Sequence, residues 1–135
     1  MTAVEAPVAP QQNSFLAFDF GTKRIGVATG SRFSGQAEPL RSIAGASPFD
    51  AIAALIKEWQ PDALVIGVPF HPDGAEHETT LRARRFGRQL NGRFRLPVHE
   101  VDERYTSVEA ESYGAKDVDA AAAALILEQF LREDR

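Results

Sequence analysis

The sequence predicts an α/β domain built on a mixed five-stranded sheet, in which an antiparallel meander is continued by parallel strands and flanked by helices. Three apolar runs, at about 14–20, 24–30 and 36–41, open the chain and are separated by turn residues. Two further apolar runs, at 63–68 and 97–101, alternate with segments of helical periodicity. A meander followed by strand–helix crossovers is typical of this fold class.

Composition indicates one globular domain. The chain has 135 residues, of which 44% are hydrophobic and 25% charged, and no apolar run approaches the roughly 20 residues of a membrane span. The absence of cysteine excludes disulfides, thiolate metal sites and cysteine nucleophiles. We expect residues 1–13 to be a disordered tail, because they are rich in Pro, Ala and Gln. They also lack the basic and apolar regions of a secretion signal. Residues 14–135 then form the domain.

The first strands are predicted as a hairpin and a third partner. Residues 15–20 read FLAFDF, the Gly21-Thr22 pair is a turn signal, and apolar residues resume from Arg24. The run at 36–41 completes the meander.

The first helix is predicted from its start signal. Ser47, Pro48 and Asp50 supply an N-cap, a proline at the first helical position and an acid in the first turn. Apolar residues follow at helical spacing until a Pro-Asp pair ends the helix. The ALVIGV run at 63–68 is continuously apolar, as in a buried parallel strand.

The rest of the chain continues the alternation. A second helix is predicted at about 76–91, a strand at 97–101, and helices at about 106–113 and 118–133. The order βββαβαβα, with no internal repeat or dividing linker, is the layout expected of an RNase H-like domain.

Four motifs carry a resemblance to a known family. They are DFGTKRIGVATG at 19–30, VIGVPFHPDG at 65–74, VDERYTSVEAE at 101–111 and VDAAAAALILEQFL at 118–131. In order and spacing they resemble the RuvX/YqgF family of nucleases, over about residues 15–131. The resemblance implies an RNase H fold, a cytoplasmic protein, a cluster of carboxylates, and action on the 5′ ends of pre-16S rRNA or on Holliday junctions. The matching motif residues are Asp19, Asp102, Glu103, Arg104 and Asp119.

The acids of these motifs predict a metal site. An unpaired carboxylate such as Asp19 in an apolar run costs several kcal/mol, so a partner must compensate it. Two divalent ions can promote phosphodiester hydrolysis. Carboxylates can hold Mg²⁺ or Mn²⁺ for this purpose. We therefore expect Asp19, Glu103 and Asp119 to converge at the strand ends as catalytic residues and metal ligands. Asp19 could instead hydrogen bond the amides of the turn after it.

Two acids have neighbours that could replace them. Adjacent residues on a strand point to opposite faces, so only one of Asp102 and Glu103 joins the cluster; Glu103 is favoured, with Asp102 as its substitute. At 100° per residue Asp119 lies on the core-facing stripe of the last helix, whereas Asp117 falls on the far side and is expected only to favour the helix start.

Basic residues predict the contacts with nucleic acid. The net charge is −4, but six of the fifteen Lys and Arg residues lie between 79 and 99, where there is no acid. The face formed by Arg84, Arg85 and Arg88 could track phosphates or be an ordinary solvated surface. Better placed beside the acids are Lys23, Arg24 and Arg104. The polar segment 70–79 is either a plain connection or a loop near the site, with contacts from His71, Asp73 and Gly74.

The predicted function is that of a metal-dependent endonuclease acting on structured nucleic acid, most directly in 5′-end processing of pre-16S rRNA. The alternative is a resolvase of four-way DNA junctions, for which paired cuts require a homodimer. DFGT also resembles the phosphate-binding opening of actin-like ATPases, but a chain of this length is expected to lack their second domain. A non-catalytic nucleic-acid module is disfavoured because every matching acid is present.

Overall fold

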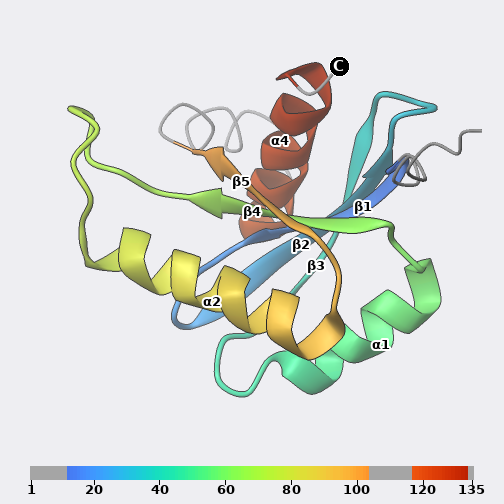
Figure 1. The fold of residues 1–135 in the computed structure, drawn as a ribbon, viewed down its shortest axis with the longest axis horizontal. Coiled ribbons are helices and arrows are strands. Elements are labelled where there is room, and N and C mark those ends of the chain that lie inside the picture. Colours follow the sequence, from blue (N-terminus) through green and yellow to red (C-terminus); the bar gives the residue numbers. More distant parts are fainter. Residues whose placement is uncertain (1–11, 104–116, 134–135) are drawn as a thin grey trace, which may run out of the picture.

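The computed structural model describes residues 12–103 and 117–133, and within them the predicted order of elements is confirmed (Figure 1). The elements are β1 (Ser14–Asp19), β2 (Arg24–Ser31), β3 (Ala37–Ala44), α1 (Phe49–Trp59), β4 (Ala63–Val68), α2 (Glu78–Phe94), β5 (Val98–Asp102) and α4 (Val118–Glu133). The helix predicted at 106–113 lies outside the described residues, as do residues 1–11 of the predicted tail. Gln12 and Asn13 hydrogen bond to the domain, through Arg32 and Asp62.

The five strands form one mixed sheet in the order β3-β2-β1-β4-β5. The pairs β1–β2 and β2–β3 are antiparallel, whereas β1–β4 and β4–β5 are parallel. The predicted meander and its parallel continuation are therefore confirmed. Since β1, β4 and β5 are parallel, their carboxyl ends meet at one edge of the sheet.

Helices cover both faces of the sheet, α4 on one side and α1 with α2 on the other (Figure 1). Successive strand residues point to opposite faces, and β1 follows this rule. Leu16 and Phe18 belong to the core under α1 and α2, whereas Phe15 and Ala17 pack with α4. Asp19, two residues beyond Ala17, continues the α4 side.

Helix α4 lies unusually close to the sheet. All five alanines at 120–124 are buried, and their small side chains allow the close packing of helix on sheet. Gly26 of β2 makes it feasible, because a Cβ at that position would lie 1.9 Å from the carbonyl oxygen of Asp119.

The predicted starts of the first two helices differ from the structure. Ser47 is not the N-cap of α1: its φ is +51°, and Pro48 takes the cap position without a side-chain cap bond. Strand β3 runs three residues past its predicted end, so residues 45–48 must turn tightly into the helix. Helix α2 begins at Glu78, because His77 caps it with Nδ1 accepting from the Thr79 N–H at 3.1 Å.

Candidate active site

Asp19 ends β1 between two glycines of the neighbouring strands. It pairs with Gly26 of β2 and with Gly67 of β4. A Cβ at Gly67 would lie 2.7 Å from Oε2 of Glu103, and a Cβ at Gly26 would meet the backbone of Asp119. The missing side chains therefore leave room on both sides of Asp19. Glu103 and the backbone of Asp119 lie on either side of this position.

Asp19 and Glu103 form a half-buried pair of carboxyl groups joined by a hydrogen bond. Burial, the charge of Asp19 and this hydrogen bond raise the pKa of Glu103 to about 9. Burial also raises the pKa of Asp19; the hydrogen bond from Glu103 opposes that rise and the charge of Asp119 adds to it. Glu103 thus keeps its proton at neutral pH and donates it to Asp19.

The structure places Glu103, rather than Asp102, beside Asp19. Val101 is buried in the core under α4, and alternation directs the side chain two residues later to the same face. The backbone N–H of Glu103 also donates to the Val68 carbonyl at 3.2 Å, which continues the β4–β5 pairing to the site. Asp102 contributes a charge that raises the pKa of Glu103 further.

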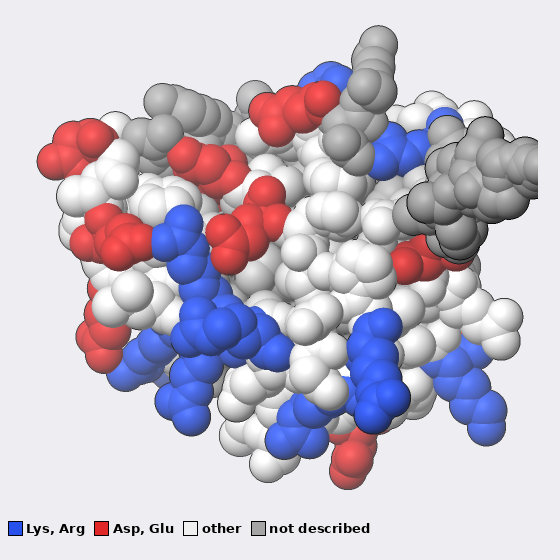
Figure 2. Space-filling view, in the orientation of Figure 1, with Lys and Arg blue, Asp and Glu red and all other residues white. Residues whose placement is uncertain are grey.

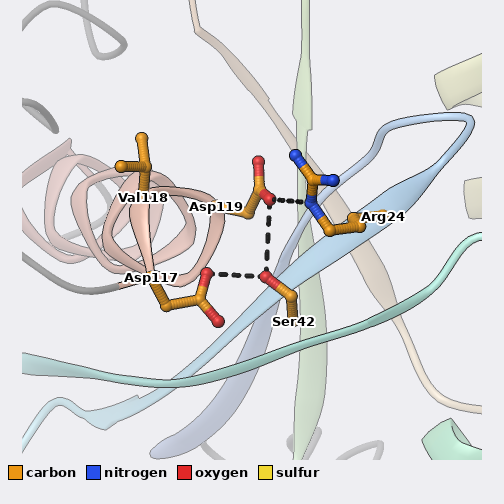
Figure 3. A pocket seen from close by; sticks show the side chains of 5 residues that line it. All are labelled: Arg24, Ser42, Asp117, Val118 and Asp119. Atoms are coloured by element: carbon orange, nitrogen blue, oxygen red, sulfur yellow. Dashed lines mark hydrogen bonds and ion pairs between the residues drawn. The ribbon is translucent and has the colours of Figure 1, made fainter.

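Asp119 stands at the first turn of α4 and is held by residues of the meander. Its Oδ2 accepts from Nε of Arg24 at 2.8 Å and lies 3.5 Å from Oγ of Ser42 (Figure 3). Within residues 12–103 and 117–133, no group of three or more Asp, Glu or His side chains is gathered closely enough to hold a metal ion. The convergence of Asp119 with the other two acids as metal ligands remains a prediction.

Asp117 caps α4, but it does not lie on the far side of that helix. Its Oδ1 accepts from the Ala120 N–H at 3.0 Å and from Ser42 Oγ at 2.6 Å. Partial burial raises the pKa of Asp117, but the hydrogen bonds of Ser42 and Ala120 outweigh it and hold that pKa below its ordinary value. The predicted position is wrong because Asp117 precedes the helix, where the 100° periodicity does not apply.

These side chains border an open pocket of about 470 Å³, lined by Arg24, Ser42, Asp117, Val118 and Asp119 (Figure 3). Ser42 lies between the two carboxylates, and Val118 points away from them. No motif of the sequence indicates Ser42. Only its register with Gly26, which the sheet fixes, brings it to the site.

The predicted basic residues have different surroundings. Lys23 is exposed in the turn before β2, and Arg24, the first residue of β2, is exposed and forms an ion pair with Asp119. Arg104 lies outside the described residues. Arg85 and Arg88 are exposed on α2, and Arg88 borders a second hollow of about 390 Å³ between α2 and β5.

Arg84 differs from its two neighbours on α2. It forms ion pairs with Glu76 and with Glu100, the latter at 3.4 Å, and lies over the ring of Phe70 at 5.3 Å. Residues 79–99 contain no acid, but their surface is not free of acids, because Glu76 and Glu100 lie beside Arg84. Figure 2 shows the Lys and Arg side chains over α2 beside acidic ones.

The loop between β4 and α2 leaves the same edge of the sheet as Asp19, and it is closed by its own contacts. The Gly74 N–H donates to the His71 carbonyl, and Gly74 has a φ of +92°. Asp73 accepts from the Ala75 N–H at 2.9 Å, and the His71 ring packs against that of His77 at 4.7 Å. Contacts from this loop to a substrate remain a prediction.

The fold and the site define an α/β protein with an RNase H-like sheet and a pair of carboxyl groups at the carboxyl edge of that sheet. RuvC of Thermus thermophilus, solved in complex with a Holliday junction substrate, has the same fold, with a TM-score of 0.57 over 90% of this chain and 96% of that one at 13% identity. A family model described as RuvX, Holliday junction resolvase, matches residues 13–133. The chain belongs to the RuvX family.

Relatives at high identity agree with this membership. A protein of Albidiferax ferrireducens named "Putative pre-16S rRNA nuclease" is 64% identical over 127 residues, which cover 93% of this chain and 81% of that protein. One of the same name from Polaromonas is 60% identical and covers 88% of both chains. The resemblance drawn from the four motifs is confirmed. None of the helices in the described part of the chain is long and apolar enough to cross a membrane.

Proposed function

We propose that this chain is a divalent-metal-dependent endonuclease that hydrolyses phosphodiester bonds in structured nucleic acid, with the 5′ end of pre-16S rRNA as its first substrate. The observation that carries the proposal is the half-buried pair of Asp19 and Glu103, which shares a proton at the carboxyl edge of the sheet. The names of the RuvX relatives support the choice of substrate. Such a substrate places the activity in the cytoplasm.

The donor set fits Mg²⁺ or Mn²⁺. Carboxylate oxygens are the ligands that these hard cations prefer, and a cation can replace the proton that Glu103 otherwise keeps. Asp19 and Glu103 would hold the ion, and Asp119 would join them by turning its side chain from Arg24. Replacing a shared proton by a cation also relieves the repulsion between the two acids.

The remaining residues serve the substrate. One or two bound ions would supply Lewis-acid chemistry, activating a water and neutralising charge on the phosphate. Arg24, which is exposed and paired with Asp119, and the exposed Lys23 before it would bind the phosphates that flank the scissile bond. The acids themselves, seated against the glycines of β2 and β4, would hold the reacting groups in place without rearrangement of the backbone.

Resolution of four-way DNA junctions is the second candidate, favoured by the description of the RuvX family model. The same chemistry cuts either substrate, but paired cuts across a junction need two sites in a symmetric dimer. Substrate shape and oligomeric state therefore separate the two functions.

Cleavage of matched substrates tests the proposal. An RNA carrying the 5′ leader of pre-16S rRNA and a four-way DNA junction would be incubated with Mg²⁺, Mn²⁺ or EDTA. Cleavage of the RNA that depends on metal and is lost in Asp19→Asn is the expected result, with Asp50→Asn, an exposed acid of α1, as the matched control. Preference for the junction, with a dimer in solution, would favour the resolvase. Full activity in EDTA would contradict both functions.

A further inference from the structure

Arg24 sets the direction of the Asp119 side chain. Its Nε donates to Asp119 Oδ2 at 2.8 Å. Ser42 is close to the same oxygen, but a hydroxyl has one hydrogen to donate, and the 2.6 Å contact of Ser42 with Asp117 takes it in preference to the 3.5 Å contact with Asp119. Of these two neighbours, Arg24 is therefore the one that holds the carboxylate.

The backbone of Asp119 packs against β2, which limits its movement. A Cβ at Gly26 would lie 1.9 Å from the Asp119 carbonyl oxygen and 2.8 Å from the Ala120 nitrogen, so the start of α4 rests directly on β2. Asp119 can leave Arg24 and reach a cation held by Asp19 and Glu103 only by rotating its side chain. A residue that controls this rotation therefore controls how many acids can bind the cation.

The ion pair between Arg24 and Asp119 is weak enough for Arg24 to change partners. The side chain of Arg24 is 64% exposed and that of Asp119 33% exposed, and exposed ion pairs contribute little to stability. In the described part of the chain the pair is joined through Nε alone. Phosphate accepts two parallel hydrogen bonds from a guanidinium group, which makes it a stronger partner for Arg24 than one carboxylate oxygen.

We propose that Arg24 is a latch on Asp119. Without nucleic acid it holds Asp119 away from the Asp19–Glu103 pair, and it releases Asp119 to that pair when a substrate phosphate binds the guanidinium group. The inference rests on the proposed function and deepens it, because it makes metal binding and phosphate binding promote each other. Such coupling is reciprocal by thermodynamic necessity.

Calorimetric titration with Mn²⁺, in the absence of nucleic acid, tests the latch. Arg24→Gln is expected to bind Mn²⁺ about 1.5 to 5 times more tightly than the wild type, the gain that the loss of an exposed ion pair allows. In an Asp119→Asn background the same substitution should give no gain, because the latch has nothing to hold. Arg41→Gln is the control: Arg41 precedes Ser42 on β3 and is exposed, but is not part of the pocket lining.

The outcomes separate the latch from general electrostatics and from the proposed function. Equal gains in Arg41→Gln, or a gain that persists beside Asp119→Asn, would mean that removing any positive charge suffices, and would overturn the latch. Unchanged or weaker binding in Arg24→Gln would also overturn it. A wild type that binds no Mn²⁺ at all would instead overturn the metal-dependent function, and the latch with it.

Discussion

The carboxyl groups of Asp19 and Glu103 are joined by a hydrogen bond, so the pair carries one proton at neutral pH. Two facing carboxylates would repel each other, and the proton removes that repulsion. The pair is thus stable without a metal ion, but only while the proton is kept. Its stability and its affinity for cations must both depend on pH.

The metal-free protein should lose stability as the pH rises from about 4.5 to about 9. In this window the folded state keeps a proton on Glu103, whose pKa is raised from 4.5 to about 9, whereas the unfolded chain has released it. Because the folded state binds more protons, its free energy of unfolding falls with increasing pH. Urea unfolding in EDTA across the window checks the slope, which Glu103→Gln should flatten and the exposed control Glu100→Gln should not.

Metal binding should release a proton. A divalent cation that binds Glu103 must displace the proton held there at neutral pH, so Mn²⁺ affinity is expected to rise with pH up to about 9. Titrations in buffers of different ionisation enthalpy measure the number of protons released. No release at neutral pH would mean that the cation binds elsewhere.

Gly26→Ala should destabilise the protein by at least about 1 to 3 kcal/mol, the usual cost of overpacking. The added methyl group would meet the backbone of Asp119, which cannot move aside cheaply. Gly92→Ala is the control, since α2 leaves open space around Gly92 and alanine favours a helix by about 0.5 to 1 kcal/mol. Denaturation midpoints of the two variants should therefore move in opposite directions.

The two acids at the start of α4 should respond differently to substitution. Asp117→Ala removes the cap and is expected to cost about 0.5 to 2 kcal/mol, with metal-induced stabilisation retained. Asp119→Asn should change stability little, because its ion pair is exposed, but should abolish cleavage and reduce the rise in thermal midpoint that Mn²⁺ produces. The opposite pattern would move the ligand to Asp117.

Arg85 and Arg88 should contribute to nucleic-acid binding, whereas Arg84 should contribute to the stability of the fold. Replacing Arg85 and Arg88 together with alanine is expected to lower the salt dependence of binding by roughly one unit per lost phosphate contact. Arg84→Ala should leave that slope unchanged and lower the thermal midpoint, because its ion pairs and its packing on Phe70 are lost. Filter binding at several salt concentrations measures both slopes.

The sequence predicts the sheet and the acids from local patterns. Apolar runs define the strands, the end of one such run identifies Asp19, and alternation along a strand limits the cluster to one of Asp102 and Glu103. The partners of these acids depend on strand register and on helix docking, which have no local pattern. Ser42 comes to the site only through β3 pairing. Arg84 meets Glu100 only because α2 packs beside β5, and the tight turn at Ser47 follows from the length of β3.

The close seat of α4 on β2 has a consequence for the order of events during synthesis. Asp19 and Gly26 belong to the first hairpin, whereas Asp119 belongs to a helix about a hundred residues later. On the ribosome, α4 is therefore synthesised after all five strands. An emerging chain can therefore build most of the sheet, yet the third acid is still missing. On the proposed mechanism, in which Asp119 joins the metal site, cleavage can begin only after α4 has left the ribosome.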